Sequence, residues 1–134
     1  MSNSIASGVA YNDPEFSTVY ATAEIGYSAL AQTAVTQLTS KSTGVTANTS
    51  AGQITMNAAS LAATTNVTFT LTNSLLSAKD VIIVNVASAN ATAGAYNAWV
   101  SSMLAGSATI TLRNITAGPL LEAVVINFAI IHAT

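Results

Sequence analysis

Short segments in which apolar and polar side chains alternate with a period of two make up most of this chain. The segment NVTFTLT (residues 66–72) sets Val67, Phe69 and Leu71 on one side and its threonines on the other, and SATITLR (107–113) repeats the pattern. This alternation is typical of strands that bury one face of a sheet. Threonine suits the half-exposed face because it is β-branched.

Turn residues separate these segments at regular intervals. Gly94, Gly106 and Gly118 fall 12 residues apart, and strands at this spacing are typical of sandwiches and barrels. The hydrophobic content of 51% is enough for one folded domain. The sequence therefore predicts an all-β fold over residues 34–134, an antiparallel β-sandwich of the jelly-roll type.

Two segments, VIIVNVA (81–87) and AVVINFAII (123–131), are apolar on both faces. Such strands must be covered on both sides. They are either central strands of a packed sandwich, or strands with one face on the core and the other on a second subunit. We expect the second arrangement. The candidate subunit-interface residues are Val84, Asn85, Val86, Ile126, Asn127 and Ile130. The two asparagines either bond each other or a second subunit, or face water at strand ends.

Charged residues are scarce along the whole chain. Three Lys or Arg and five Asp or Glu occur in 134 residues, whereas about a quarter of an ordinary domain is charged. Three cations are too few to neutralise a phosphate backbone, so nucleic acid is not an expected partner. Residues 34–134 hold five of the eight charges, all at predicted turns or strand ends. The strand faces are therefore neutral.

Motifs for catalysis, cofactors and metals are missing. The chain has no cysteine and one histidine, His132, which gives no metal-ligand set. The patterns GxSxG, GxGxxG and GxxxxGK[ST] do not occur, and Asp13 and Glu15 are better interpreted as solvated or capping residues. The most apolar stretch, residues 120–131, is too short to span a membrane. We therefore expect no enzyme, cofactor or membrane partner, and synthesis in the cytoplasm without a secretory signal.

The segment ITAGPL suggests one specific hairpin. A four-residue loop at 116–119 would place Arg113 opposite Glu122 in neighbouring strands. Such an exposed cross-strand ion pair contributes at most about 1 kcal/mol. The alternative is that both charges are independently solvated.

Residues 1–33 differ from the rest and are predicted to be a separate arm. They hold three acidic residues and three of the four tyrosines. Asp13 and Pro14 could start a helix, but STVYATAEI (17–25) also alternates, so we expect an extended arm. This arm either docks on a partner or packs back on its own domain. The candidate docking residues of the arm are Tyr11, Pro14, Phe16 and Tyr20.

Several strings of the β region resemble a small β module of tailed-phage virion proteins, which include head decoration or cement proteins and fibre-type proteins. The strings are TQLTSKSTGVT, GQITMN, FTLTNS, LRNITAG and LLEAVVINFA. The resemblance covers roughly residues 26–131. It implies a structural role in the virion and supplies no catalytic residues.

These observations together lead to one expected function. The chain is expected to be a capsid decoration (cement) protein that forms a homo-oligomer, with a trimer favoured, and binds the outer surface of the assembled head. Its partners would be itself and the major capsid protein, and its location the virion. The alternative is a fibre knob that binds a receptor glycan through Tyr96 and Trp99, although core packing is the more ordinary role for both aromatic residues.

Overall fold

The computed structural model describes residues 17–88 and 92–133 of the chain, which form a β structure with one short 3-10 helix. The described residues contain no α-helix. The elements are η1 (Ala29–Ala31), β1 (Gln32–Thr36), β2 (Val45–Thr46), β3 (Ala51–Thr55), β4 (Asn66–Thr72), β5 (Val81–Ser88), β6 (Tyr96–Leu104), β7 (Ser107–Asn114) and β8 (Val125–Ile131).

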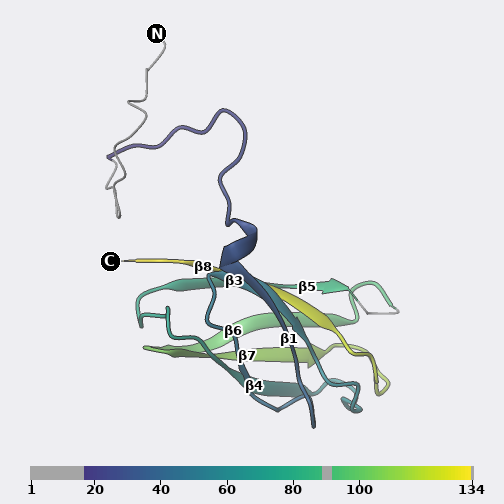
Figure 1. Ribbon diagram of the computed structural model, residues 1–134. Helices are drawn as coiled ribbons and strands as arrows, with labels where there is room; N and C mark the ends of the chain where they lie inside the picture. Colours follow the sequence, from purple (N-terminus) through teal and green to yellow (C-terminus); the bar gives the residue numbers. More distant parts are fainter. Residues whose placement is uncertain (1–16, 89–91, 134) are drawn as a thin grey trace.

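The strands form two four-stranded sheets that pack face to face (Figure 1). The first sheet has the order β1-β3-β8-β5 and the second the order β2-β4-β7-β6. The expected all-β sandwich is confirmed. The jelly-roll type of connection stays a prediction.

Successive strands alternate between the two sheets along most of the chain. Among the described strands, β6 and β7 are the only consecutive pair in one sheet, and Gly106 adopts a φ of +80° in the tight loop between them. β1 and β3 run parallel, as do β2 and β4, because each pair is separated by a strand in the opposite sheet that returns the chain. The sheets are therefore mixed, whereas the sequence predicted purely antiparallel pairing.

The hydrophobic core lies between the two sheets. The alternation in the sequence places one side of each strand there, and each fully buried aliphatic side chain contributes about 1.5–3 kcal/mol to folding. The largest fully buried apolar side chains are Ile54, Met56, Leu71, Ile110, Leu112, Val124, Ile126 and Ile130.

The hairpin predicted around residues 116–119 does not form. β7 lies in the second sheet, where Arg113 is opposite Asn66 and Asn97, while Glu122 precedes β8 in the first sheet. Residues 115–124 carry the chain across the sandwich, because β8 fills the centre of the opposite sheet. The predicted cross-strand pairing of Arg113 with Glu122 is therefore wrong.

In the described part of the predicted arm, residues 17–26 stand away from both sheets (Figure 1), and Tyr27 contacts β8. Residues 17–30 are all exposed, and residues 17–28 are not helical. This agrees with an extended arm. The helix start considered at Asp13 and Pro14 lies outside the described residues. β1 begins at Gln32, so this strand includes the last two residues assigned to the arm.

Candidate interaction surface

The outer face of the first sheet consists of neutral side chains, many of them apolar. Ile82, Ile126 and Ile130 point into the core, so the residues next to them in each strand point outward. The outer face of the first sheet comprises Gln32, Ala34, Thr36, Ala51, Gln53, Thr55, Val81, Ile83, Asn85, Val125, Asn127, Ala129 and Ile131. No side chain in this set is charged.

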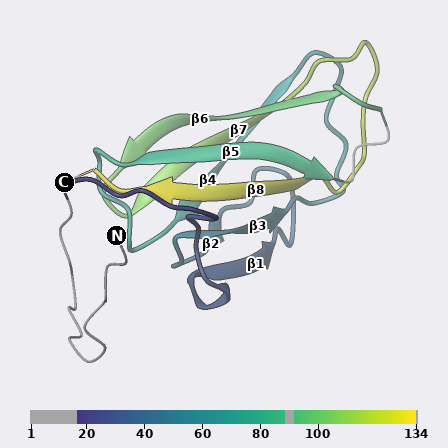
Figure 2. The same ribbon diagram turned by 90° about the horizontal axis from the view of Figure 1, so that it is seen from above.

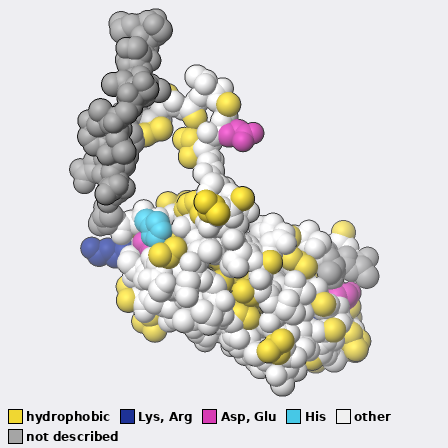
Figure 3. All heavy atoms as spheres, viewed as in Figure 1, with side chains coloured by type: hydrophobic (Ala, Val, Ile, Leu, Met, Phe, Trp, Pro, Cys, Tyr) yellow, Lys and Arg dark blue, Asp and Glu magenta, His cyan; other side chains and the backbone are white. Residues whose placement is uncertain are grey.

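Three branched aliphatic side chains gather where β5 begins and β8 ends. Val81 lies opposite Ile131, and Ile83 lies opposite Ala129. Val81, Ile83 and Ile131 are each 54% exposed. Isolated exposed aliphatic residues are ordinary, but neighbouring ones mark contact surfaces. Figure 3 shows apolar side chains gathered where the arm joins the domain, with a basic side chain, an acidic side chain and the histidine beside them.

A row of amide side chains crosses the same face. Asn127 lies directly opposite Asn85 on one side and Gln53 on the other. Asn85 is exposed, whereas the Oδ1 atom of Asn127 is buried and accepts no hydrogen bond within the described structure. A buried polar atom without a partner costs about 1–3 kcal/mol.

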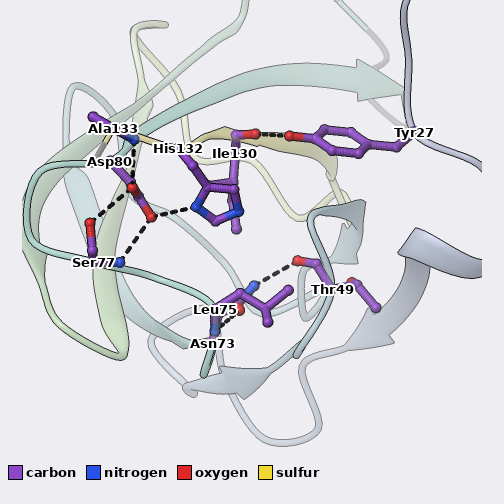
Figure 4. A network of polar contacts seen from close by, with 9 residues as sticks. All are labelled: Tyr27, Thr49, Asn73, Leu75, Ser77, Asp80, Ile130, His132 and Ala133. Carbon is purple, nitrogen blue, oxygen red and sulfur yellow. Dashed lines mark hydrogen bonds and ion pairs between the residues drawn. The ribbon is translucent and has the colours of Figure 1, made fainter. Parts of the chain in front are cut away.

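A groove of about 560 Å³ lies between Tyr27 and the first sheet. Its position is fixed by Tyr27, whose hydroxyl donates to the Ile130 carbonyl (Figure 4) and whose own carbonyl accepts from Nε2 of Gln32 at 3.0 Å. The groove therefore offers amides, hydroxyls and aromatic carbon but no charge. We call it the Tyr27 groove; its lining residues are Tyr27, Gln32, Thr33, Ala34, Ala51, Gly52, Gln53, Asn127 and Phe128.

The predicted subunit-interface residues divide between the two sides of the first sheet. Ile126 and Ile130 are 0% exposed in the chain's own core, so their assignment to a subunit contact is wrong. Val84 and Val86 also pack against this core and are half-buried. Only Asn85 and Asn127 lie on the outer face.

Sequence reasoning missed Val81, Ile83 and Ile131 as exposed residues of these two strands. In a strand that is apolar on both sides, alternation does not show which side faces the core. The two asparagines could have indicated the outer face. Asn85 and Asn127 are at odd-numbered positions, as are Val81, Ile83 and Ile131, so all five side chains lie on the same side of the sheet.

Of the four predicted capsid-docking residues, the structure describes only Tyr20, which is 91% exposed. Tyr11, Pro14 and Phe16 lie outside the described residues. Other large apolar side chains of the arm are also exposed, namely Val19, Ile25 and Leu30. The described arm therefore exposes apolar surface that its own domain does not cover.

Lys41 is a buried cation near the crossing segments of the sandwich. Its Nζ atom donates to the carbonyl oxygens of Asn57 and Glu122, both at 2.6 Å. Burial lowers the pKa of the Lys41 ammonium, while the negative charge of Glu122 opposes this shift. The Tyr96 hydroxyl donates to the Glu122 carboxylate, and burial together with Glu122 raises the pKa of this phenol. The cluster joins elements of both sheets.

Asp80 anchors the end of β8. Its carboxylate accepts from the Ser77 backbone N–H at 2.9 Å and the Ala133 backbone N–H at 3.0 Å, and lies 2.9 Å from Nδ1 of His132 (Figure 4). These hydrogen bonds, that of Ser77 first, hold the pKa of Asp80 well below its usual range. His132, expected to be a tail residue, therefore contacts the domain.

The surface holds fewer charges than the composition suggests. Lys41 is 3% and Asp80 6% exposed, and Glu122 is half-buried. Arg113 and Lys79 are the exposed charges of the domain within the described residues. Lys41, Asp80 and Glu122 form the hydrogen bonds described above, which connect parts of the fold, and the three side chains do not line one common pocket.

Searches for a metal site and a membrane span gave no candidate in the described chain. No group of three or more His, Cys, Asp or Glu side chains in residues 17–88 and 92–133 is arranged to hold a metal ion. No helix within this part of the chain is long and apolar enough to cross a membrane.

The two aromatic residues considered for glycan stacking are poorly placed for it. Tyr96 is 8% exposed and belongs to the core. Trp99 is half-buried on β6, opposite Thr111. The expected packing role is confirmed for Tyr96.

Comparisons of the chain with protein-family models, curated proteins and solved structures find no match.

Proposed function

We propose that the chain is a structural protein of a tailed-phage virion, a capsid decoration (cement) protein without enzymatic activity or cofactor. It forms a homo-oligomer, with a trimer favoured, and binds the major capsid protein on the outer surface of the assembled head. The observation that carries this proposal is the uncharged outer face of the first sheet, with Val81, Ile83 and Ile131 exposed beside one another.

The outer face of the first sheet supports self-association. An uncharged face can be buried without leaving an unpaired charge. A decoration protein needs such repeated, neutral contacts on a symmetric shell.

The arm supports a second contact, with the capsid. Tyr20 is exposed on a segment that lies away from the domain (Figure 1). Tyrosine is enriched at protein interfaces because its ring buries a large area and its hydroxyl still finds a partner. Contacts of this kind across coat-subunit boundaries stabilise the assembled head by mass action.

Head binding tests the proposal. Purified protein is mixed with heads that lack it, sedimented, and the bound fraction is measured. We expect the full chain to bind, and deletion of residues 1–16 combined with Tyr20→Ala to lower occupancy at least about tenfold. Leu121→Ala, an exposed residue far from the arm in sequence, is the matched control. Unchanged occupancy of the deletion variant would remove the arm from the capsid contact, and no binding by the full chain would reject the decoration role.

The Tyr27 groove favours one alternative, a fibre knob that binds a receptor. Amide side chains beside a tyrosine ring suit a neutral sugar, and 560 Å³ lies within the usual range for ligand sites. Titration with neutral oligosaccharides, followed by isothermal calorimetry, tests this. Saturable binding that Gln53→Ala abolishes would favour the fibre knob.

A further inference from the structure

The four edge strands of the sandwich differ in their protection against pairing with another strand. Natural sheets blunt their edges with short strands, bulges, prolines or charges. β2 has only two residues, and β6 has a bulge between Val100 and Ser102. β5 keeps its register with β8 over Val81–Val86 and has a bulge only at its end, between Val86 and Ser88. β1 keeps an unbroken register with β3 over five residues and contains no proline or charge. Among the described edge strands longer than two residues, β1 is the one without a bulge.

The backbone of β1 directs free hydrogen-bonding groups outward at this edge. The Gln37 N–H donates to the Thr55 carbonyl of β3 at 2.9 Å. Backbone groups alternate in direction along a strand, so odd-numbered residues of β1 face β3, and Gln32, Ala34 and Thr36 face away from it. Ala34 lies in the middle of this free edge.

The arm has the pattern of an amphipathic strand but belongs to no sheet in the described structure. From residue 18 to residue 25, odd positions are apolar and even positions are mostly polar. Residues 17–26 are all exposed. The apolar positions are Val19, Ala21, Ala23 and Ile25, and the opposite positions are Thr18, Tyr20, Thr22 and Glu24.

The arm leads away from the free edge of its own β1. The Tyr27 hydroxyl donates to the Ile130 carbonyl of β8, and β8 is separated from β1 by β3. The arm thus lies over the β8 side of the first sheet, and the coil of η1 joins it to the start of β1 (Figure 2). The free edge lies on the other side of β1, where the arm of a different molecule can reach it.

We infer that residues 17–26 of one copy add as a strand to the free edge of β1 in a second copy. Ten extended residues span about 33 Å, enough to pair with the roughly 16 Å of β1. The apolar side chains would extend the core beside Val35, which is half-buried at its margin. Tyr20, on the opposite side of the strand, stays free for the capsid.

This contact joins different surfaces of the two copies, so it is head-to-tail and closes into a ring when the rotation between copies permits. A trimer is such a ring. Main-chain hydrogen bonds along an added strand supply affinity, as in other cases of strand addition. The inference rests on the self-association in the proposed function and adds to the outer face of the first sheet a second contact between copies.

Disulfide trapping between two single-cysteine variants tests this strand addition between copies. The method is clean because the chain has no cysteine of its own. One population carries Ala34→Cys. The other carries one cysteine on the face shared with Ala34, and the four variants are Thr18→Cys, Tyr20→Cys, Thr22→Cys and Glu24→Cys. Directly opposite residues of paired strands lie about 4.5–5.5 Å apart between Cα atoms, within reach of a disulfide. We expect a mixed dimer on non-reducing gels for at least one arm variant.

Two controls separate specific pairing from random oxidation. Ala21→Cys lies on the opposite side of the added strand, and Ser102→Cys lies on β6, an edge that a bulge protects. Both should give at least about tenfold less mixed dimer than the best pair. Equal yields in all combinations, or no mixed dimer with any of the four arm variants, would overturn the strand addition between copies.

Charge at the edge gives an independent measurement on the full chain. Ala34→Lys should raise the dissociation constant of the oligomer at least about tenfold, because an edge lysine opposes strand addition. Asn97→Lys, an exposed position on β6, should leave it unchanged. If Ala34→Lys has no effect while Ile83→Lys dissociates the oligomer, the strand exchange is wrong and the proposed function stands. A monomeric wild-type chain that also fails to bind heads would reject both.

Discussion

The two outer faces of the sandwich are built on the same alternating pattern but carry different chemistry. The second sheet presents hydroxyls: Thr68 and Thr70 of β4 are exposed, and the Thr111 hydroxyl of β7 donates to Ser101 at 2.9 Å. The first sheet presents Val81 and Ile83 with a row of amides. Neither face depends on charge for its chemistry.

This difference separates a face suited to water from a face suited to contact. Threonine keeps the β-branched shape that a strand favours and still offers water a hydroxyl. Valine and isoleucine have the same shape but leave apolar area in water, at about 25 cal/mol for each Å². The chain could carry threonine on both faces. The aliphatic residues on the first sheet are therefore the basis for proposing a contact on this face.

The largest expected effect is a loss of unfolding free energy on substitution in β8. It should occur on the side of the strand that faces the core and not on its outer side. Ile126→Ala should lower the free energy of unfolding by about 2–5 kcal/mol, because it leaves a cavity in the core. Ile131→Ala, at a position 54% exposed, should change it by less than about 0.5 kcal/mol in the monomer. Urea denaturation at low protein concentration measures both. Similar losses would show that the outer side also belongs to the monomer's core.

The two faces belong to two sheets that pack against each other, and the hydrogen bonds of Lys41 connect segments of both sheets. Substitution of Lys41 tests how much these bonds stabilise the sandwich. Lys41→Met should destabilise the fold by about 1–3 kcal/mol, since the carbonyls of Asn57 and Glu122 lose their donor. Lys79→Met, at an exposed position, is the control and should be neutral within about 0.5 kcal/mol. Thermal unfolding monitored by circular dichroism gives the difference. An unaffected Lys41→Met variant would show that the cluster does not stabilise the sandwich.

Placing the same charge on each face tests the contrast directly. Ile83→Lys should weaken self-association at least about tenfold, or about 1.4 kcal/mol, because the ammonium must be desolvated at the contact. Thr70→Lys on the second sheet should have no effect. Light scattering over a dilution series provides the measurement. Equal behaviour of the two variants would mean that the aliphatic face is not the subunit contact.

The smallest expected effect is on the stability of the fold at acidic pH. It tests whether Asp80 stabilises the end of β8, a strand of the aliphatic face. Hydrogen bonds from Ser77 and Ala133 hold the pKa of Asp80 below its usual value. The resulting stability is present above the unfolded-state pKa of about 3.9 and is lost as the pH falls toward the lower folded-state value. Asp80→Asn should therefore flatten the fall in unfolding free energy below about pH 4. Unchanged acid sensitivity would show that Asp80 does not contribute to it.

The sequence predicted which segments are strands, and which side of each strand faces the core, better than it predicted which strands pair with each other. In SATITLR, alternation correctly placed Ile110 and Leu112 inside, because side-chain direction is a local property of a strand. The pairing of Arg113 with Glu122 failed because alternation carries no information on which strand lies alongside. The chain crosses between sheets after β7, and hydrophobic pattern alone cannot distinguish such a crossing from a hairpin.

The candidate site was predictable only in part, for a similar physical reason. Asn85 and Asn127 were identified because a polar residue inside an apolar strand is conspicuous. The burial of Lys41 and Asp80 could not be foreseen, since their partners lie far away in the sequence, as with Asn57 and Ala133. Such contacts exist only once the fold has formed.

The position of β8 in the first sheet has a consequence for synthesis. β8 follows the other described strands in the chain, yet it lies between β3 and β5. A nascent chain still lacking residues 125–131 holds those two strands without the one that joins them. The first sheet therefore closes only after residues 125–131 have left the exit tunnel of the ribosome. Until then, the β6–β7 hairpin, whose contacts are local, is the part best able to form early.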